Sequence, residues 1–263
     1  MDAVGTLLFE MSSPDRLKIL LLLKKAPLKL SHISEKLDFT VQETARNISR
    51  LTEAKLLAKD VNGLLHLTPY GEEILELLSG FRFLLKNNDY FLKHSAKSLP
   101  KRFELSLGVL EGADLISDVM VVFHNVEKMI AEAQESICIL TNQILASSLP
   151  FLIQAMSRGV TFRLIMPKEY TPTKEITKLV NAPAFEQAAR AGKMDFRFME
   201  KVGVFLCFSE RQVAALGFSD SEGKLDYASF ATQDLAALDW AKDLYNYYWN
   251  SASDRIPDQL FTS

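Results

Sequence analysis

Polar side chains recur along one side of a helix that the sequence predicts over residues 41–55. They are Gln42, Glu43, Arg46 and Arg50, and Glu53 follows them. Arg46 and Arg50 lie one helical turn apart, and each guanidinium could bind a guanine edge through two hydrogen bonds or bind a phosphate. The Gln42 amide suits adenine, and the Glu43 carboxylate could accept a hydrogen bond from cytosine. The chemistry indicated here is recognition of a nucleic acid.

The other side of the same helix is predicted to face a core. Val41, Thr44, Ile48 and Leu51 recur at steps of three and four, which is the spacing of a buried stripe. Thr40, directly before the helix, is included among the candidate contact residues. The alternative interpretation is that Gln42, Arg46 and Arg50 form an ordinary solvated helix face.

The neighbouring elements must position this helix. A helix over 13–25 is expected to begin with Ser13 as N-cap and Pro14 at the first position, and Ser31 is expected to cap a second helix over 31–38. After the polar helix come two short strands, 56–59 and 64–68, joined at Asn62-Gly63. Both of these residues accept the positive φ of a tight turn, so a hairpin is predicted. A fourth helix is expected from about Tyr70.

Three helices followed by a hairpin is the winged-helix order. Residues 1–80, with the run LTEAKLLAKDVNGLLHLTPYG, resemble the winged-helix domain of prokaryotic regulators of the arsenic-repressor-like and multiple-antibiotic-resistance-like kinds. The resemblance implies that the helix over 41–55 enters the major groove of double-stranded DNA and that the hairpin contacts the backbone. Lys59 and Asn62 are then candidates for phosphate contacts. A winged helix that serves protein contacts alone is the alternative.

Residues 81–112 are predicted to form a helical linker and dimerisation segment. Phe83, Leu84, Tyr90 and Phe91 would offer apolar surface there to a second copy of the chain. From residue 113 the pattern changes, because β-rich runs at 136–141, 161–167, 194–200, 203–209 and 212–219 alternate with helical segments at 149–159 and 182–192. Strand and helix alternation predicts an α/β domain over 113–263, with the last two strands paired as a hairpin.

This second part resembles the effector domain of archaeal winged-helix regulators of the methanogenesis-regulator type, which are related to phospholipase-D-like sensor domains. The matching runs are SICILTNQ, GVTFRLIMP, MDFRFME and DLAALDWAKDLYNYYW. The expected fold is therefore an α+β amino-terminal winged helix-turn-helix followed by an α/β, phospholipase-D-like effector domain. Such a domain would sense an effector, mediate dimerisation, or both.

Catalysis is not expected. A phospholipase-D enzyme uses a histidine nucleophile in a His-x-Lys pattern, and the run KVGVFLCFSE holds no histidine. His124 is the one histidine beyond residue 100, and it falls in a predicted helix. A degenerate phospholipase-D-like enzyme is the alternative. No ligand spacing such as Cys-x-x-Cys occurs, so neither a metal nor a cofactor is expected, and Cys138 and Cys207 are interpreted as buried thiols, with a redox switch as the alternative.

Candidate effector contacts follow from the sheet. Ligands of open α/β sheets gather at the carboxyl ends of strands, where Asn142, Lys168 and Asp220 stand in this sequence. The alternative is that all three are ordinary polar loop residues.

Composition and charge fit an intracellular regulator. Two cysteines cannot form a disulfide framework, no signal peptide is recognised, and no apolar run is long enough to cross a bilayer. Residues 1–102 carry 16 Lys and Arg against 12 Asp and Glu, whereas residues 103–263 carry 14 against 21, so the basic half coincides with the predicted DNA-binding part. We expect a cytoplasmic transcriptional regulator that binds a roughly palindromic operator as a homodimer, without membrane contact. Operator, effector and the direction of regulation stay open.

Overall fold

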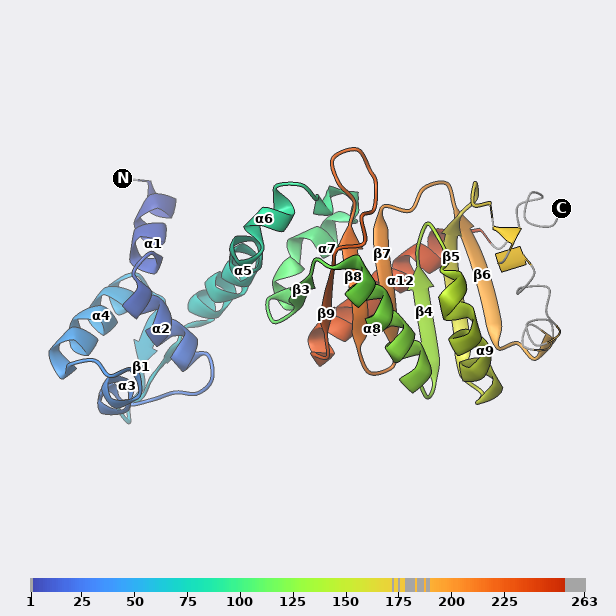
Figure 1. The fold of residues 1–263 in the computed structure, drawn as a ribbon. Helices are drawn as coiled ribbons and strands as arrows, with labels where there is room; N and C mark the ends of the chain where they lie inside the picture. The colour runs from blue at the N-terminus through green and yellow to red at the C-terminus, as the bar shows by residue number, and fades with distance from the viewer. Residues whose placement is uncertain are drawn as a thin grey trace. The chain divides into compact units, whose positions relative to one another are not determined.

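The computed structural model describes residues 2–171, 173–174, 176–177, 183, 187 and 190–253. The chain divides into two compact units, Met1–Phe81 and Arg82–Ser263 (Figure 1). The first has one hydrophobic core, and the second has two, which lie on opposite faces of a sheet. Within the described residues, no helix is long and apolar enough to span a membrane.

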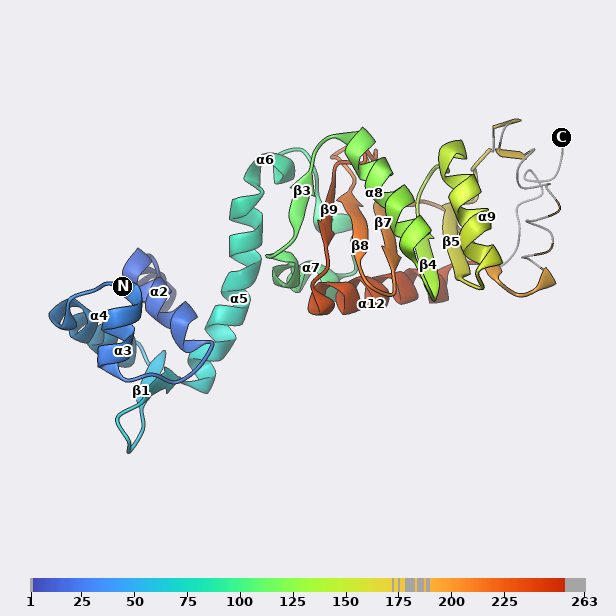
Figure 2. The same cartoon turned by 60° about the horizontal axis from the view of Figure 1, so that its bottom comes forward.

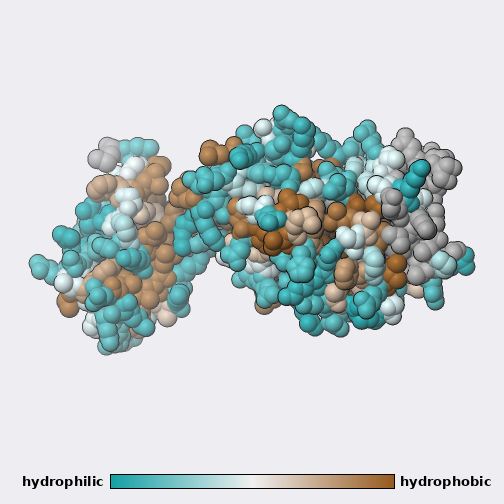
Figure 3. All heavy atoms as spheres, in the orientation of Figure 1, coloured by the Kyte–Doolittle hydropathy of each residue, from teal (hydrophilic) through white to brown (hydrophobic). Residues whose placement is uncertain are grey.

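The first unit contains helices, then a hairpin, then the start of a long helix. Its elements are α1 (Ala3–Met11), α2 (Pro14–Leu23), α3 (Leu30–Leu37), α4 (Val41–Glu53), β1 (Leu57–Lys59), β2 (Leu65–Leu67) and α5 (Pro69–Lys86). The predicted helices and hairpin are confirmed, with shifted ends. Helix α1 was not predicted, although Val4, Leu7, Leu8 and Met11 have helical spacing. Hydrophobic residues reach the surface over α1 (Figure 3), where Val4, Leu8 and Phe9 are exposed.

Of the two helix starts for which a cap was predicted, one is correct. The Ser13 hydroxyl accepts a hydrogen bond from the backbone N–H of Arg16, and Pro14 occupies the first turn of α2. The prediction of Ser31 as a cap was wrong, because Lys29 is the N-cap of α3. The physical reason lies one residue earlier: Leu28 pairs with Leu65 in an antiparallel bridge, which keeps the chain extended up to the cap.

The hairpin is confirmed, but its turn differs from the prediction. Gly63 has a φ of 79°, and Asn62 is not among the residues with positive φ. The Asp60 carboxylate accepts hydrogen bonds from the backbone N–H groups of Asn62 and Leu64, and the N–H of Gly63 donates to the carbonyl of Asp60. The loop is thus longer than the expected two-residue turn, since Asp60 organises it and only the glycine requires a left-handed backbone.

The second unit is a mixed α/β structure built on one seven-stranded sheet. In spatial order its strands are β3 (Asp114–Ile116), β9 (Ser229–Thr232), β8 (Val213–Phe218), β7 (Val204–Ser209), β4 (Ser136–Leu140), β5 (Thr161–Pro167) and β6 (Met194–Met199). Strands β4, β5 and β6 are parallel, and the remaining pairs are antiparallel. The five predicted strands and the β7–β8 hairpin are confirmed. The short strands β3, at one edge of the sheet, and β9, between β3 and β8, were not predicted.

Helices cover both faces of this sheet. Helices α8 (Val119–Glu132) and α9 (Leu149–Ser157) lie on one face, and α12 (Leu235–Ser251) crosses the other (Figures 1 and 2). Shorter helices complete the unit: α6 (Asn88–Phe91), η1 (Ala96–Ser98), α7 (Lys101–Leu105), η2 (Leu107–Leu110) and η3 (Ala146–Ser148). Cys138 belongs to the core beneath α12, and Cys207 belongs to the core beneath α8 and α9. The predicted helix over 182–192 lies largely outside the described residues.

The segment 81–112 packs into the second unit's own core. Phe83 and Tyr90 are buried there, and Phe91 packs against them, so the expectation that these rings offer surface to a second copy was wrong. Their burial follows from ring contacts with the sheet, because Phe83 and Tyr90 both lie 5.0 Å from Phe230 of β9, measured between ring centroids. Leu84 is the exposed member of the predicted set.

Candidate nucleic-acid interface and ligand site

Helix α4 has the two-sided character that its sequence predicts. Thr44, Asn47, Ile48 and Leu51 are buried on one side, and Gln42 and Arg46 are exposed on the other. Neither of these two exposed side chains has a hydrogen-bond partner within the described residues. Val41 was expected in the buried stripe but is 63% exposed, because it occupies the first position of the helix, at the edge of the core. The structure thus leaves one amide and one guanidinium available to a ligand.

Thr40 and Glu43 form a capping box at the start of α4. The Glu43 N–H donates to the Thr40 hydroxyl, and the Glu43 carboxylate accepts from both the backbone N–H and the hydroxyl of Thr40, at 3.1 and 2.8 Å. The hydrogen bond from the Thr40 hydroxyl, followed by that from its backbone, lowers the pKa of Glu43. Both side chains therefore fix where the helix begins, since the box satisfies donors that have no partner inside the helix.

Arg50 is tied to α1. Its Nε and Nη2 atoms donate to the two carboxylate oxygens of Glu10 at 2.9 and 2.6 Å, and its guanidinium stacks 5.4 Å from the Phe9 ring centroid. Arg16 approaches the same carboxylate from α2, with Nε 3.3 Å from Oε2. The Arg50 hydrogen bond is the main cause that lowers the pKa of Glu10, and it outweighs the opposing effect of burial.

Glu10 is a residue that the sequence analysis missed. A glutamate one residue before the end of an apolar helix gives no signal of its function by itself. Arg16 of α2 and Arg50 of α4 both contact its carboxylate, so Glu10 connects three helices, and these contacts form only when the unit folds.

The hairpin carries the remaining predicted contacts. Lys59 and Asn62 are exposed, and Val61 at the tip is fully exposed. Asp60 holds the backbone of the tip in place through its two hydrogen bonds. The hairpin therefore presents one ammonium, one amide and one apolar side chain on a braced loop.

The run Leu-Thr-Pro-Tyr-Gly attaches α5 to this hairpin. The Thr68 hydroxyl donates to the carbonyl of Lys55 and accepts from the N–H of Gly71. A Cβ atom at Gly71 would lie 2.3 Å from the carbonyl oxygen of Leu56, so glycine is required for this close approach. Thr68 and Gly71, which belong to the run that resembles winged-helix regulators, thus serve the packing of α5 against the hairpin.

The three ligand candidates of the second unit make separate contacts. The Tyr227 hydroxyl donates to Asn142, Lys168 pairs with Glu200, and the Asp220 carboxylate accepts from the backbone N–H groups of a turn. Those backbone groups, with Lys224 first, lower the pKa of Asp220. In the described part of the chain, no hydrogen bond or ion pair joins any two of the three candidates. Asn142 lies beside a cavity, because its neighbours Thr141 and Gln143 line one.

His124, Cys138 and Cys207 were the candidates considered for catalysis, metal binding or redox chemistry. His124 is exposed on α8, and no group of three or more His, Cys, Asp or Glu side chains among the described residues could hold a metal ion. Burial raises the pKa of the Cys138 thiol to about 11 and also raises that of Cys207. Thiolate chemistry near neutral pH is therefore disfavoured at both cysteines.

One protein-family model matches part of the second unit. Residues 122–251 match the family described as Methanogenesis regulatory protein FilR1, middle domain. The FilR1 match begins inside α8 and ends with α12, so it covers the central strands β4 to β8, β9 and the helices on both faces of the sheet. It confirms the resemblance to methanogenesis regulators. A search of curated proteins finds no match.

Solved structures with related arrangements are distant. TrmBL2, described as an archaeal chromatin protein with a novel mode of DNA binding, is 14% identical, with 92% of this chain and 94% of that chain covered and a TM-score of 0.43. NucT from Helicobacter pylori is 14% identical over 53% of this chain and 95% of its own, with a TM-score of 0.40. Nuc from Salmonella typhimurium, a phospholipase D family member, is 16% identical over 49% and 88%, with a TM-score of 0.34. At these scores the likeness carries no functional information.

Proposed function

We propose that this chain is a DNA-binding transcriptional regulator in which residues 1–80 form a winged helix and the α/β unit is a phospholipase-D-like effector domain. The observation that carries the proposal is the exposed pair on α4, Gln42 and Arg46, opposite a side where Thr44, Ile48 and Leu51 are buried. The FilR1 match of residues 122–251 supports the same proposal, because it assigns the second unit to a regulatory-protein family.

The docking follows from the dimensions of DNA. The major groove admits one α-helix, and a guanidinium or an amide on its exposed side can form two hydrogen bonds with a base edge. Gln42 and Arg46 would make these contacts from α4. Lys59 and Asn62 would contact phosphates from the hairpin, where backbone neutralisation supplies affinity without sequence preference.

The other predicted contacts take supporting functions in this proposal. The Nε and Nη2 atoms of Arg50 already donate to the Glu10 carboxylate. Arg50 would therefore hold α4 in position and contact a phosphate, and it would not form two hydrogen bonds with a base edge. Thr40 and Glu43 would set the angle at which the capped end of α4 enters the groove. A capped helix end with free N–H groups also favours a nearby phosphate.

We further propose a homodimer formed through α5. Leu77, Phe81, Leu84 and Leu85 are exposed at helical spacing on this helix, with Leu77 67% and Leu85 73% exposed. Burying such a stripe against a second copy would remove apolar surface from water. A Leu77→Glu/Phe81→Glu variant should sediment as a monomer, whereas Leu92→Glu, at an exposed leucine beyond α5, should not change the oligomeric state.

Binding to genomic DNA tests the main proposal. The full-length protein would be incubated with fragments of its own genome, the retained fragments sequenced, and the affinity for one enriched site measured by fluorescence anisotropy between 50 and 300 mM salt. We expect the logarithm of affinity to fall steeply with the logarithm of salt, by about 0.9 for each phosphate contact. A flat dependence without enrichment would instead support a winged helix that binds protein.

The effector domain is proposed to sense and not to catalyse. A phosphodiesterase assay with a generic phosphodiester, such as bis-p-nitrophenyl phosphate, separates the two. Turnover that survives His124→Ala and repeated purification would show a phospholipase-D-like activity carried by other groups and would contradict this part of the proposal.

A further inference from the structure

A cavity lies inside the second unit, between the sheet and the helices α8 and α9. Its wall is built from apolar side chains of both helices and of four strands, among them Phe123, Val126, Leu149, Leu164 and Phe205. It offers about 60 Å³ to the centre of a water-sized sphere, several times what one water molecule needs. Atoms that line such a hollow lose packing contacts on one side, which a bound apolar molecule would restore.

The chemistry of the lining limits the occupant. None of the described residues that line the cavity is charged, and its polar members are Thr141, Gln143, Ser148 and Tyr227, with the thiol of Cys207. An ion moved into such surroundings would lose its hydration without a compensating partner. A water cluster is also disfavoured, since apolar cavities remain dry and bind small hydrocarbons. The lining therefore suits an uncharged molecule with an apolar body.

One wall of the cavity is strained. Tyr227 has a φ of 67°, which a bulky side chain rarely adopts, and strain of this kind persists where the surroundings impose it and often has a function. Its ring packs 5.3 Å from Phe123 and 5.0 Å from Phe205, measured between ring centroids, and its hydroxyl donates to Asn142. Tyr227 is thus a side chain that contacts both the cavity lining and the loop after β4.

We propose that this cavity binds a small uncharged molecule about the size of a single aromatic ring, with Tyr227 as the wall that responds to it. The inference rests on the proposed function only in calling the molecule an effector. The rim is formed by the segment after β4, where Gln143 is exposed and Leu145 is half-buried.

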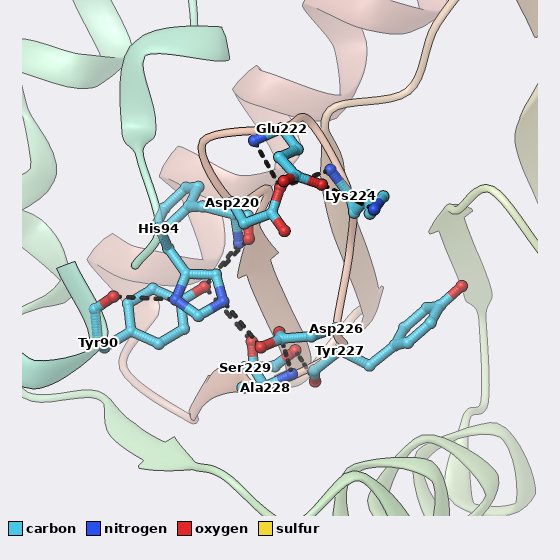
Figure 4. A network of polar contacts seen from close by, with 10 residues as sticks. Tyr90, His94, Asp220, Glu222, Lys224, Asp226, Tyr227, Ala228 and Ser229 are labelled. Atoms are coloured by element: carbon cyan, nitrogen blue, oxygen red, sulfur yellow. Dashed lines mark hydrogen bonds and ion pairs between the residues drawn. The ribbon is translucent and has the colours of Figure 1, made fainter. Parts of the chain in front are cut away.

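A chain of contacts leads from this wall to α6. Asp226, the residue before Tyr227, has Oδ2 2.9 Å from Nε2 of the buried His94, while Nδ1 of His94 lies 2.9 Å from the carbonyl oxygen of Tyr90. The rings of His94 and Tyr90 stack at 3.9 Å. Figure 4 shows the Tyr227 ring turned away from His94 and the Asp226 carboxylate turned toward it. Asp226 thus links the residue that lines the cavity to the buried His94.

The test is a titration of the full-length protein, carrying ¹³C-labelled methyl groups of Ile, Leu and Val, with toluene. We expect saturable shifts at Leu149, Leu152 and Leu164, and none with benzoate, which has the same ring and a charge. Leu145→Trp at the rim should weaken toluene binding at least tenfold. Leu105→Trp, at an exposed leucine of α7, should bind as the wild type does.

The outcomes separate the cavity from the proposed regulation. No saturable shift at these methyl groups, equal shifts with benzoate, or unchanged binding by Leu145→Trp would each overturn the cavity proposal. Saturable toluene binding supports it even if no DNA is bound, because the readout does not involve the first unit. Specific DNA binding without any toluene response would leave the proposed function intact and remove this inference.

Discussion

The Arg50 guanidinium of α4 and the Glu10 carboxylate of α1 form a two-point ion pair, with nitrogen–oxygen distances of 2.9 and 2.6 Å. Arg16 of α2 adds a third cation–carboxylate contact. The carboxylate is largely buried, whereas the Arg50 side chain is 41% exposed. Arg50 therefore ties α4 to α1, and its exposed part is the part that would contact a phosphate in the proposed complex.

Replacing Glu10 should destabilise the first unit in a pH-dependent manner. Glu10→Gln leaves two guanidinium groups beside an uncharged amide, so we expect the midpoint of thermal unfolding at pH 7 to fall by several degrees. The pKa of Glu10 is lowered on folding from its usual 4.5, so the stabilisation is complete above that value and is lost as the pH falls through the lowered pKa. Thermal unfolding followed by circular dichroism at pH 7 and pH 3 measures both effects.

The exposed Glu35 of α3 gives the matched control for this change. Glu35→Gln removes the same charge from the same unit, and its unfolding midpoint should stay close to that of the wild type. Equal loss of stability in both variants, or a Glu10→Gln effect that is as large at pH 3 as at pH 7, would show that the ion pair is not the cause.

Arg46 and Arg50 should respond differently to substitution. Arg46→Ala should weaken DNA binding by about 1–3 kcal/mol if it contacts a base, without a change in unfolding midpoint. Arg50→Ala should lower the midpoint as well as the affinity, because it also leaves Glu10 without its main partner. Anisotropy and thermal unfolding on the same samples separate the two. Lys97→Ala in the second unit controls for the lost charge, and identical behaviour of both arginine variants would refute the assignment.

Gly71 should not tolerate a side chain. Gly71→Ala would place a methyl group 2.3 Å from the backbone oxygen of Leu56, and the resulting shift should cost about 1–3 kcal/mol of stability. Gly5→Ala is the control, because Gly5 lies in α1 with no atom within 4 Å of the added carbon. Chemical denaturation should show a lower midpoint for the first variant alone. A wild-type midpoint for Gly71→Ala would mean that α5 can move away from the hairpin freely.

The Asp60 carboxylate should determine the order of the hairpin tip. Asp60→Ala removes the acceptor of two backbone N–H groups, so Asn62 and Lys59 would lose their fixed positions. We expect hydrogen exchange at residues 60–64 to accelerate at least tenfold and DNA affinity to fall modestly, while α2 stays protected. Asp60→Asn, which keeps an acceptor oxygen, should restore most of the protection. Unchanged exchange in the alanine variant would show that Gly63 suffices for the turn.

Local patterns predicted the elements that carry the strongest sequence signals. Helix α4 has an apolar stripe at helical spacing, and strand β5 was predicted with its observed ends because its mostly apolar run lies between the helix stop at Gly159 and the polar Lys168. The same patterns could not show that Phe83 and Tyr90 are buried. Amphipathic segments bury one side against whichever surface the fold brings near, and the contacts with Phe230 join residues about 140 positions apart.

Local patterns likewise predicted only part of the candidate site, because its other part depends on contacts between distant residues. Exposure of Gln42 and Arg46 follows from helical periodicity alone. The pairing of Arg50 with Glu10 depends on the folded position of α1. The positive φ of Tyr227 could not be predicted, because positive φ is expected at glycine and this position holds a tyrosine. Long-range partners and strained residues leave no periodic trace in a sequence.

Cys138 and Cys207 lie in the cores on opposite faces of the sheet, and their burial has a practical consequence for spectroscopy. Each thiol is buried in a different core, and burial raises the pKa of both. A maleimide or nitroxide reagent at pH 7 should therefore leave the native thiols unmodified and label a new cysteine at the fully exposed Val61. In the proposed homodimer, the distance between the two hairpin labels could be recorded by electron paramagnetic resonance, with and without DNA.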